Sequence, residues 1–351
     1  PLPVDEFFPL TYPFSPTDHV FTDARVVVRE DEPSSIIAFT LDSQNYREQL
    51  ANSRQSRSDA PLTELRHADG SHYLYEFDTE TIKLWCKIFF AEQFDALRHM
   101  CGCAEQFVQS LSRCFKWDSR GGKSGSAFLK TRDDRFVVKQ LSRTELDGFS
   151  KFAPQYFTYL AECQSALRPT ALTKIFGYFR IGFKNTHTGR SFKMDFMVME
   201  NLLYGRSVDR IFDLKGSTRH RFVQESGQPH EVLQDENLMQ RAQSSPLLVR
   251  EHSKRILRTA LHNDSLFLTE MNVMDYSLIM ALDTSRNKMV IGIIDYLRTY
   301  TWDKRVESFV KETAILGGGG KGEPTLQSVI HIRRCRRLRP NRSRWAPDHE
   351  Q

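Results

Sequence analysis

Hydrophobic and polar residues change their spacing several times along this chain, and each change predicts a different element. From about residue 72, Tyr73–Phe77 and Thr81–Phe90 show the alternation of strands that bury one face. Ala91–Met100 and Glu105–Phe115 instead place apolar residues three and four positions apart, which predicts two helices. Two short apolar runs then surround the polar turn 132–135, which predicts a hairpin over 127–141.

The later part of the chain combines a second predicted hairpin with longer helical segments. Apolar runs around the polar turn 284–288 predict a second hairpin, with strands Ser277–Leu282 and Met289–Ile294. The other expected elements are helices at 145–168 and 253–271 and strands at 173–180 and 192–200. This mixed order, without regular alternation of strand and helix, favours an α+β protein of two lobes.

Residues 1–70 have a different texture, rich in Pro, Ser and acidic residues. Ala24–Arg29 resembles a strand, Ile36–Leu41 is a second apolar island, and 42–70 is expected to be a solvated connector that is helical in part. We therefore predict a partly ordered segment at 1–70 ahead of the main domain. Because the chain begins Pro1-Leu2-Pro3 without Met, we expect it to be a piece of a longer protein.

Composition and charge narrow the class of protein. The chain has 351 residues, of which 40% are hydrophobic and 26% charged, as in an ordinary globular protein. No run is long and apolar enough for a membrane-spanning helix. The six cysteines lack the spacing of a zinc site, and we expect them to be reduced thiols in a cytoplasmic protein. The net charge of +5 comes from residues 331–351, which argues against a nucleic-acid partner because the body of the chain is neutral.

A glycine-rich segment precedes the first hairpin and is the first candidate for chemistry. It consists of Gly121, Gly122, Lys123, Ser124, Gly125 and Ser126. Such a loop lets backbone N–H groups approach phosphate oxygens, although glycine-rich segments also serve as simple turns. It is not a Walker loop, because Trp117 stands where that pattern requires glycine.

Lys139 lies on the return strand of the same hairpin, on one face with Val137 and Leu141. A lysine directed to a covered surface needs an anion beside it, and a nucleotide phosphate in front of the glycine loop is one such anion. The alternative is a lysine whose stem lies on apolar surface while its ammonium reaches water.

Two aspartates flank the second hairpin. Asp295 ends the apolar strand Met289–Ile294, and Asp275 stands just before its partner strand, so folding of the hairpin brings the two together. Paired carboxylates in one site suit phosphoryl transfer: one holds Mg²⁺ and the other accepts the proton of the attacking hydroxyl. With the glycine loop and Lys139 they form the set of parts that kinases use, although the His-Arg-Asp and Asp-Phe-Gly motifs of protein kinases are missing.

Several motifs resemble those of the phosphatidylinositol phosphate kinases. They are Ile211-Phe-Asp-Leu-Lys-Gly-Ser217, Met274-Asp-Tyr-Ser-Leu278 and Gly292-Ile-Ile-Asp-Tyr296. The glycine loop, Phe152-Ala-Pro154, Val198-Met-Glu-Asn-Leu202 and Gly317-Gly-Gly-Gly-Lys321 are similar to the type III branch, which contains the PIKfyve-like phosphatidylinositol 3-phosphate 5-kinases. The resemblance covers residues 18–326 and implies a two-lobed kinase-like fold over 71–326, with an antiparallel sheet and helices in an N-lobe (71–200) and a mixed C-lobe (201–326).

The resemblance also implies a role for each candidate residue. ATP would lie under the glycine loop and against Lys139, with its adenine at a hinge formed by Val198, Met199, Glu200, Asn201 and Leu202. Lys215 would be a second catalytic lysine, Asp275 the catalytic-loop aspartate, and Asp295 a catalytic residue that binds Mg²⁺. Residues 296–325 would be the activation segment, in which Lys311 and Lys321 offer charges to the lipid headgroup; the alternative is a flexible linker.

The basic tail, 327–351, departs from the family pattern, and two interpretations stay open: it binds anionic lipid, or it is an aberrant ending. The resemblance implies a lipid kinase that uses ATP and Mg²⁺ to phosphorylate the 5-hydroxyl of phosphatidylinositol 3-phosphate. Phosphatidylinositol 4-phosphate as the substrate, and a catalytically impaired scaffold, are the alternatives. It further implies peripheral attachment to an endosomal or vacuolar membrane, with further domains and scaffold or regulatory proteins as partners.

Overall fold

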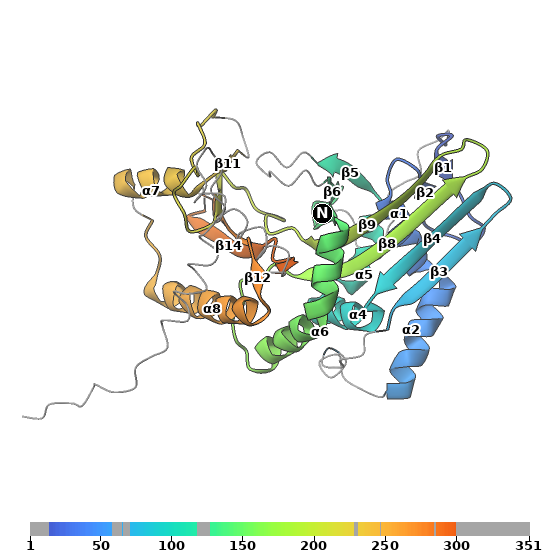
Figure 1. Ribbon diagram of the computed structural model, residues 1–351, viewed down its shortest axis with the longest axis horizontal. Coiled ribbons are helices and arrows are strands. Elements are labelled where there is room, and N and C mark those ends of the chain that lie inside the picture. Colours follow the sequence, from blue (N-terminus) through green and yellow to red (C-terminus); the bar gives the residue numbers. More distant parts are fainter. Residues whose placement is uncertain are drawn as a thin grey trace, which may run out of the picture.

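Two sheets organise the part of the chain that the computed structural model describes, which is residues 14–57, 65, 71–117, 127–227, 231–245, 247–283 and 286–299. The larger sheet belongs to an N-terminal lobe and the smaller one to a C-terminal lobe (Figure 1). The expected α+β fold with an antiparallel sheet is confirmed.

The N-terminal sheet has seven strands in the order β3-β4-β8-β9-β7-β6-β5, and every neighbouring pair is antiparallel. Its longest arm is the hairpin of β8 and β9, which continues beyond the predicted strand end at Arg180. The strands are β3 (Tyr73–Asp78), β4 (Ile82–Phe89), β5 (Cys114–Trp117), β6 (Phe128–Thr131), β7 (Phe136–Gln140), β8 (Ile175–Asn185) and β9 (Ser191–Glu200).

Helices from the start of the chain cover one face of this sheet. Every residue of α1 (Ser34–Asp42) is buried, which explains its unbroken apolar run at Ile36–Leu41. Tyr46 of α2 (Gln44–Arg57) packs edge-on against Tyr73 and Tyr75, with ring centroids 6.5 and 6.1 Å apart. Residues numbered below 70 therefore share the core of the N-terminal lobe, along with α4 (Ala91–Met100) and α5 (Ala104–Leu111).

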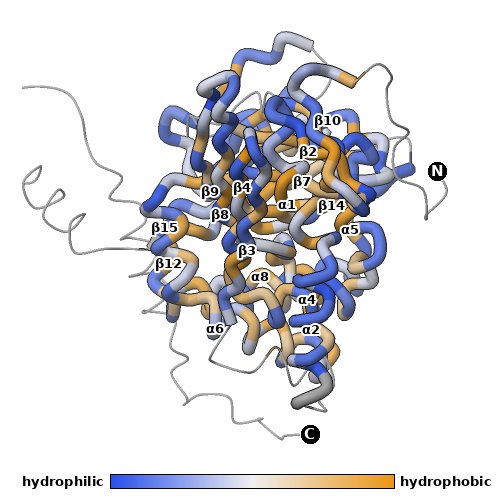
Figure 2. Tube along the Cα trace, turned by 90° about the vertical axis from the view of Figure 1, so that its right-hand side faces the viewer, coloured by the Kyte–Doolittle hydropathy of each residue, from blue (hydrophilic) through white to orange (hydrophobic). Residues whose placement is uncertain are grey.

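The opposite face carries α6 (Arg143–Ser165), which crosses the near side of the sheet in Figure 1. Phe149 of this helix stacks on Tyr178 of β8, with ring centroids 4.3 Å apart. Figure 2 shows hydrophobic residues along β7 and α1 inside the molecule and hydrophilic ones along its outside. Within the described ranges no helix is both apolar and long enough to cross a membrane.

The C-terminal sheet has the order β11-β10-β13-β14, in which only the β10–β11 pair is parallel. It contains the predicted hairpin of β13 and β14, whose existence is confirmed. The elements of this lobe are β10 (Arg210–Leu214), β11 (Val232–Leu233), α7 (Asp235–Ser244), α8 (Glu251–Glu270), β12 (Val273–Met274), β13 (Ser277–Asp283), β14 (Lys288–Ile294) and β15 (Arg298–Thr299).

Backbone hydrogen bonds join the two lobes directly beside β14. Ile293 N donates to Ala171 O at 2.7 Å, and Thr173 N donates to Ile293 O at 3.0 Å. Asp264 of α8, which is fully buried, accepts hydrogen bonds from Tyr159 Oη at 2.6 Å and from the backbone N–H of Ala171 at 2.6 Å. These contacts connect α6, the chain leading into β8 and the C-terminal lobe.

Two local predictions are wrong. The helix expected over Glu105–Phe115 ends at Leu111, because Cys114–Trp117 pairs with β6 as the last strand of the sheet. The strand expected at Ala24–Arg29 is limited to β2 (Val28–Arg29), which pairs with β1 (Asp18–His19). The domain limits at residues 70 and 326 stay predictions.

Candidate active site

Lys139 lies in the N-terminal sheet with its ammonium between two carboxylates. The residue is 2% exposed, and its Nζ lies 3.1 Å from Glu145 Oε1 and 2.8 Å from Asp295 Oδ1. Lys139 is buried, and the anions beside it are two side chains of this chain, while the predicted contact with a nucleotide phosphate stays a prediction. Because Asp295 follows β14, this contact links the two lobes across the site.

Glu145 was not among the residues predicted for the site. It is the third residue of α6, and its Oε2 accepts hydrogen bonds from the backbone N and the Oγ of Ser142, which forms a capping box. Burial alone would raise the pKa of Glu145, but the Ser142 hydrogen bonds and the Lys139 charge outweigh it and hold the pKa below its ordinary value. The sequence signal was Ser142-x-x-Glu145 at a helix start, three residues after the strand lysine.

The two aspartates stand on facing segments, as the hairpin predicted. Ser277 pairs with Ile294 in one ladder and Met274 with Arg298 in the next, so Asp275 and Asp295 lie in the gap between the ladders. Both have left-handed backbones, with φ of 60° for Asp275 and 59° for Asp295. Such conformations cost energy outside glycine and are common at functional sites.

Lys215 follows β10, which runs antiparallel to β13 and pairs Leu214 with Leu278. This register carries the lysine to the end of the sheet where Asp275 stands. Lys215 Nζ donates a hydrogen bond to the backbone carbonyl of Asp275 at 2.8 Å. The structure therefore brings Lys215 to Asp275, which spacing in the sequence alone did not indicate.

Tyr296, the residue after Asp295, anchors the adjoining backbone in the core. Its ring is buried beside Tyr156 of α6, with centroids 6.2 Å apart, and its hydroxyl donates to the carbonyl of Thr173. Burial raises the pKa of the Tyr296 hydroxyl well above its ordinary value, so it remains a hydrogen-bond donor.

Residues 198–202 cross from β9 toward the second lobe, and their side chains have separate roles. Glu200 Oε1 accepts a hydrogen bond from Lys174 N at 2.6 Å, and Asn201 Nδ2 donates to Asp134 O at 2.7 Å. Leu202 lies against Gly292 of β14, where an added Cβ would come within 2.5 Å of Leu202 Cδ1. Glu200 and Asn201 thus hold this segment in place, while the Leu202 side chain packs against β14 of the C-terminal lobe.

The glycine loop, Gly121 to Ser126, lies outside the described residues, as do Lys311, Lys321 and the tail. The described end of the loop is β6, whose Phe128 is paired with Lys139 in the ladder. The described ranges hold no group of three metal-ligating side chains. A Mg²⁺ ion at Asp295, which is 39% exposed, would take its other ligands from phosphates and water, as this ion commonly does.

The arrangement joins Lys139 to Asp295 and Lys215 to Asp275, with Glu145 as a further carboxylate beside Lys139. Lys139 and Lys215 can meet phosphate oxygens, Asp295 can hold a divalent cation, and Asp275 can accept a proton. These are the elements of a phosphoryl-transfer site, built from the ends of β7, β10, β12 and β14.

Comparison with known proteins agrees with this chemistry. Residues 110–290, a little more than half of the chain, match the family model described as phosphatidylinositol-4-phosphate 5-kinase. The chain is 40% identical over 396 aligned residues to 1-phosphatidylinositol 3-phosphate 5-kinase FAB1 of Saccharomyces cerevisiae, with 88% of this chain and 17% of that protein covered.

Two further relatives come from plants and animals. One is 1-phosphatidylinositol-3-phosphate 5-kinase FAB1B of Arabidopsis thaliana, 39% identical with 89% of this chain and 20% of the relative covered. The other is 1-phosphatidylinositol 3-phosphate 5-kinase of Homo sapiens, 42% identical with 84% of this chain and 14% of the relative covered. The chain thus spans a fifth or less of the length of these relatives, and it belongs to the phosphatidylinositol-4-phosphate 5-kinase family.

Proposed function

We propose that this chain is the catalytic region of a lipid kinase that transfers the γ-phosphate of ATP to the 5-hydroxyl of phosphatidylinositol 3-phosphate, giving phosphatidylinositol 3,5-bisphosphate. The observation that carries the proposal is the pair of contacts Lys139–Asp295 and Lys215–Asp275, at the positions that the family motifs mark. The names of the relatives from yeast, plant and human support the choice of lipid.

In this proposal the chain positions both reactants and disperses charge. The Asp275 carboxylate accepts the proton of the inositol 5-hydroxyl while the hydroxyl oxygen bonds to the γ-phosphorus of ATP. The bond between the γ-phosphorus and the β–γ bridging oxygen breaks, and its electron pair leaves with ADP. Lys215 stabilises the charge on the transferred group, and Lys139 contacts the ATP phosphates. Bound Mg²⁺ would neutralise phosphate charge, with Asp295 as its protein ligand.

The remaining expected roles belong to the same proposal. Gly121, Gly122, Lys123, Ser124, Gly125 and Ser126 would cover the phosphates, Val198–Leu202 would hold adenine, and Lys311 and Lys321 would meet the lipid headgroup. The enzyme would work while attached peripherally to an endosomal or vacuolar membrane, with further domains and regulatory proteins as partners.

A direct test incubates the purified chain with radiolabelled ATP, Mg²⁺ and vesicles that contain phosphatidylinositol 3-phosphate, 4-phosphate or 5-phosphate. We expect label in the bisphosphate made from the 3-phosphate, identified by chromatography of the deacylated headgroup. Asp275→Asn is the inactive control. It should lower the rate of phosphate transfer by at least about 100-fold without loss of ATP binding. Wild-type transfer in that variant would refute the assigned base.

A second candidate substrate is phosphatidylinositol 4-phosphate, which the description of the matching family model favours. The same assay decides between the two lipids. Preferential labelling of the 4-phosphate would replace the first proposal, while the roles of Lys139, Lys215, Asp275 and Asp295 would stay.

A further inference from the structure

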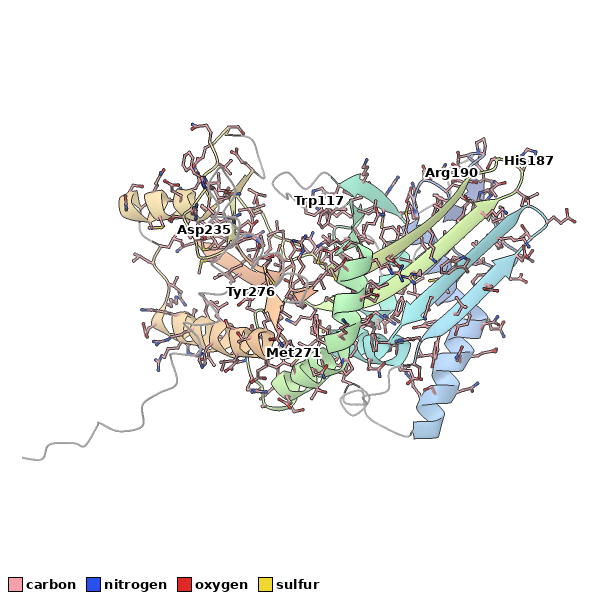
Figure 3. All side chains as sticks on the ribbon, viewed as in Figure 1. Trp117, His187, Arg190, Asp235, Met271 and Tyr276 are labelled. Carbon is pink, nitrogen blue, oxygen red and sulfur yellow. The ribbon has the colours of Figure 1, made fainter. Side chains whose placement is uncertain are left out.

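The turn that carries Lys215 is wrapped around one carboxylate. Asp235 Oδ1 accepts hydrogen bonds from the backbone N–H groups of Lys215 at 3.0 Å, Gly216 at 2.8 Å and Ser217 at 3.3 Å. Gly216 has φ +72°, a left-handed conformation that lets the successive N–H groups converge. Asp235 is 6% exposed and begins α7, 20 residues after Lys215 (Figure 3).

Arg221 completes the enclosure of this carboxylate. Its Nε donates to Asp235 Oδ2 at 2.9 Å, and another guanidinium nitrogen donates to the carbonyl of Asp213. Asp235 and Arg221 together therefore hold the backbone on both sides of Lys215. Four donors on one buried carboxylate compensate its loss of water.

Lys215 itself has little else to fix it. The residue is exposed, and its four-carbon side chain ends on the Asp275 carbonyl at 2.8 Å. A lysine on the surface has many accessible rotamers, so the place of its Nζ depends on where its backbone is held. Among the described contacts of the Lys215 backbone N–H, Asp235 is the acceptor.

We infer that Asp235 is a positioning residue for phosphoryl transfer, which acts by fixing the turn 215–217 so that Lys215 reaches Asp275 and the transferred group. The inference rests on the proposed catalytic role of Lys215. Its rival is a purely local role, in which Asp235 stabilises α7 as an acidic residue in the first turn. Glu236 is the other acidic residue of that turn and serves as the control.

The first test compares Asp235→Asn with Glu236→Gln, which remove one negative charge each from the same helical turn. We expect Asp235→Asn to lower kcat by about 10- to 100-fold, because a misplaced catalytic group costs up to two orders of magnitude. KM for ATP should not change, since the glycine loop, Lys139 and residues 198–202 hold the nucleotide. Glu236→Gln should keep the wild-type kcat.

The second test places both changes on a Lys215→Ala background. If Asp235 acts through Lys215, Asp235→Asn should lower kcat no further there. An equal loss on both backgrounds overturns the inference. Wild-type activity of Lys215→Ala alone would instead refute the role of Lys215 in the proposed function, so the two failures are distinct.

Hydrogen exchange supplies a readout that does not depend on the reaction. In Asp235→Asn the amides of Lys215, Gly216 and Ser217 should lose protection while those of α8 keep it. If Asp235→Asn does not fold, Asp235→Glu takes its place in the test, because a glutamate retains the negative charge that pairs with Arg221. Protected amides with near wild-type kcat support the inference, and unprotected amides with wild-type kcat overturn it.

Discussion

The ammonium of Lys139 lies between the carboxylates of Glu145 and Asp295. These three charges set the local electrostatics of the candidate site. Removing Glu145 is costly, because the buried ammonium is then left with one carboxylate in place of two and with little access to water. Glu145 is the member that also fixes the start of α6, through Ser142. Its loss should therefore affect both activity and stability.

We predict that Glu145→Gln lowers the free energy of unfolding by about 1–3 kcal/mol near neutral pH, the usual range for a hydrogen bond to a charged group. The pKa of Glu145 lies below its ordinary 4.5, so its ionised form contributes stability above that pH and loses it as the pH falls through the lowered value. Thermal unfolding between pH 7 and pH 3 should show the two proteins converging in acid. A constant difference would contradict the assignment of the charge.

Gly292 is the second residue with a direct consequence, because an added Cβ would lie 2.5 and 2.8 Å from the two Cδ atoms of Leu202. We predict that Gly292→Ala displaces Leu202 and raises KM for ATP several-fold, with KM for lipid unchanged. The steady-state kinetics of each substrate check this. Adding Leu202→Ala should relieve the clash between the new methyl group and Leu202. A double variant that unfolds at a lower temperature than either single variant would contradict this explanation.

At the scale of elements, the capping box at the start of α6 connects helix stability to the site. Ser142 Oγ lies 2.8 Å from Glu145 Oε2 and 3.3 Å from the Glu145 backbone N. The helix is oriented by Phe149 on Tyr178, but its first turn depends on these polar contacts.

We predict that Ser142→Ala costs about 1 kcal/mol of stability, the usual value for an N-cap, and lowers kcat because Glu145 loses both hydrogen bonds that it makes with Ser142 Oγ. Ser150→Ala is the control on the same helix: its hydroxyl donates to Leu146 O within the helix and touches no site residue. Urea unfolding and the lipid kinase assay measure both effects. An equal loss in the two variants would mean that the cap has no special connection to the site.

Local patterns predicted most elements because their apolar residues are buried in the hydrophobic cores. The hairpin of β13 and β14 is an example, since its strands consist of seven residues each around a polar turn. The helix over 105–115 was overextended because Phe115 fits a helical spacing, whereas its edge-strand pairing with Lys130 is a long-range contact. Glu145 was missed although its partners Ser142 and Lys139 are close in sequence, because a capping-box pattern does not show that the carboxylate also reaches the lysine ammonium.

For the whole molecule, the Asp264 contacts hold the lobes together beside the site. Asp264 accepts from Tyr159 Oη at 2.6 Å, Thr170 Oγ1 at 2.8 Å and Ala171 N at 2.6 Å. Burial and the Asp264 carboxylate raise the pKa of Tyr159 far above its ordinary value, so the hydroxyl stays protonated as the donor.

We predict that Asp264→Asn lowers the free energy of unfolding by about 2–4 kcal/mol, because the buried amide cannot accept at both positions. Calorimetry should then show unfolding that is less cooperative, with the C-terminal lobe separating first. Glu270→Gln, at the exposed last residue of the same helix, is the control and should change stability by less than about 0.5 kcal/mol. A fully cooperative transition at the wild-type temperature would contradict this role of Asp264.

The candidate site was predictable only in part. Lys139, Asp275 and Asp295 followed from strand burial and hairpin geometry, and Lys215 followed from the family resemblance. Asp235 and Tyr296 were not predicted, because each acts on residues that are distant in sequence, and Glu145 was missed although Lys139 is close to it in the chain. The roles of the glycine loop, Lys311 and Lys321 stay predictions.

The Lys139–Asp295 contact has a consequence for the form of the nucleotide that the proposed site would accept. Lys139 and Asp295 form an ion pair, so under the proposed function an arriving nucleotide would take the place of Asp295 beside Lys139, while Glu145 stays next to the ammonium. Metal-free ATP offers an anion to Lys139 but leaves Asp295 without a cation, whereas the magnesium complex compensates both. Under the proposed function the contact would therefore act as an intramolecular competitor that favours binding of the magnesium complex over metal-free ATP.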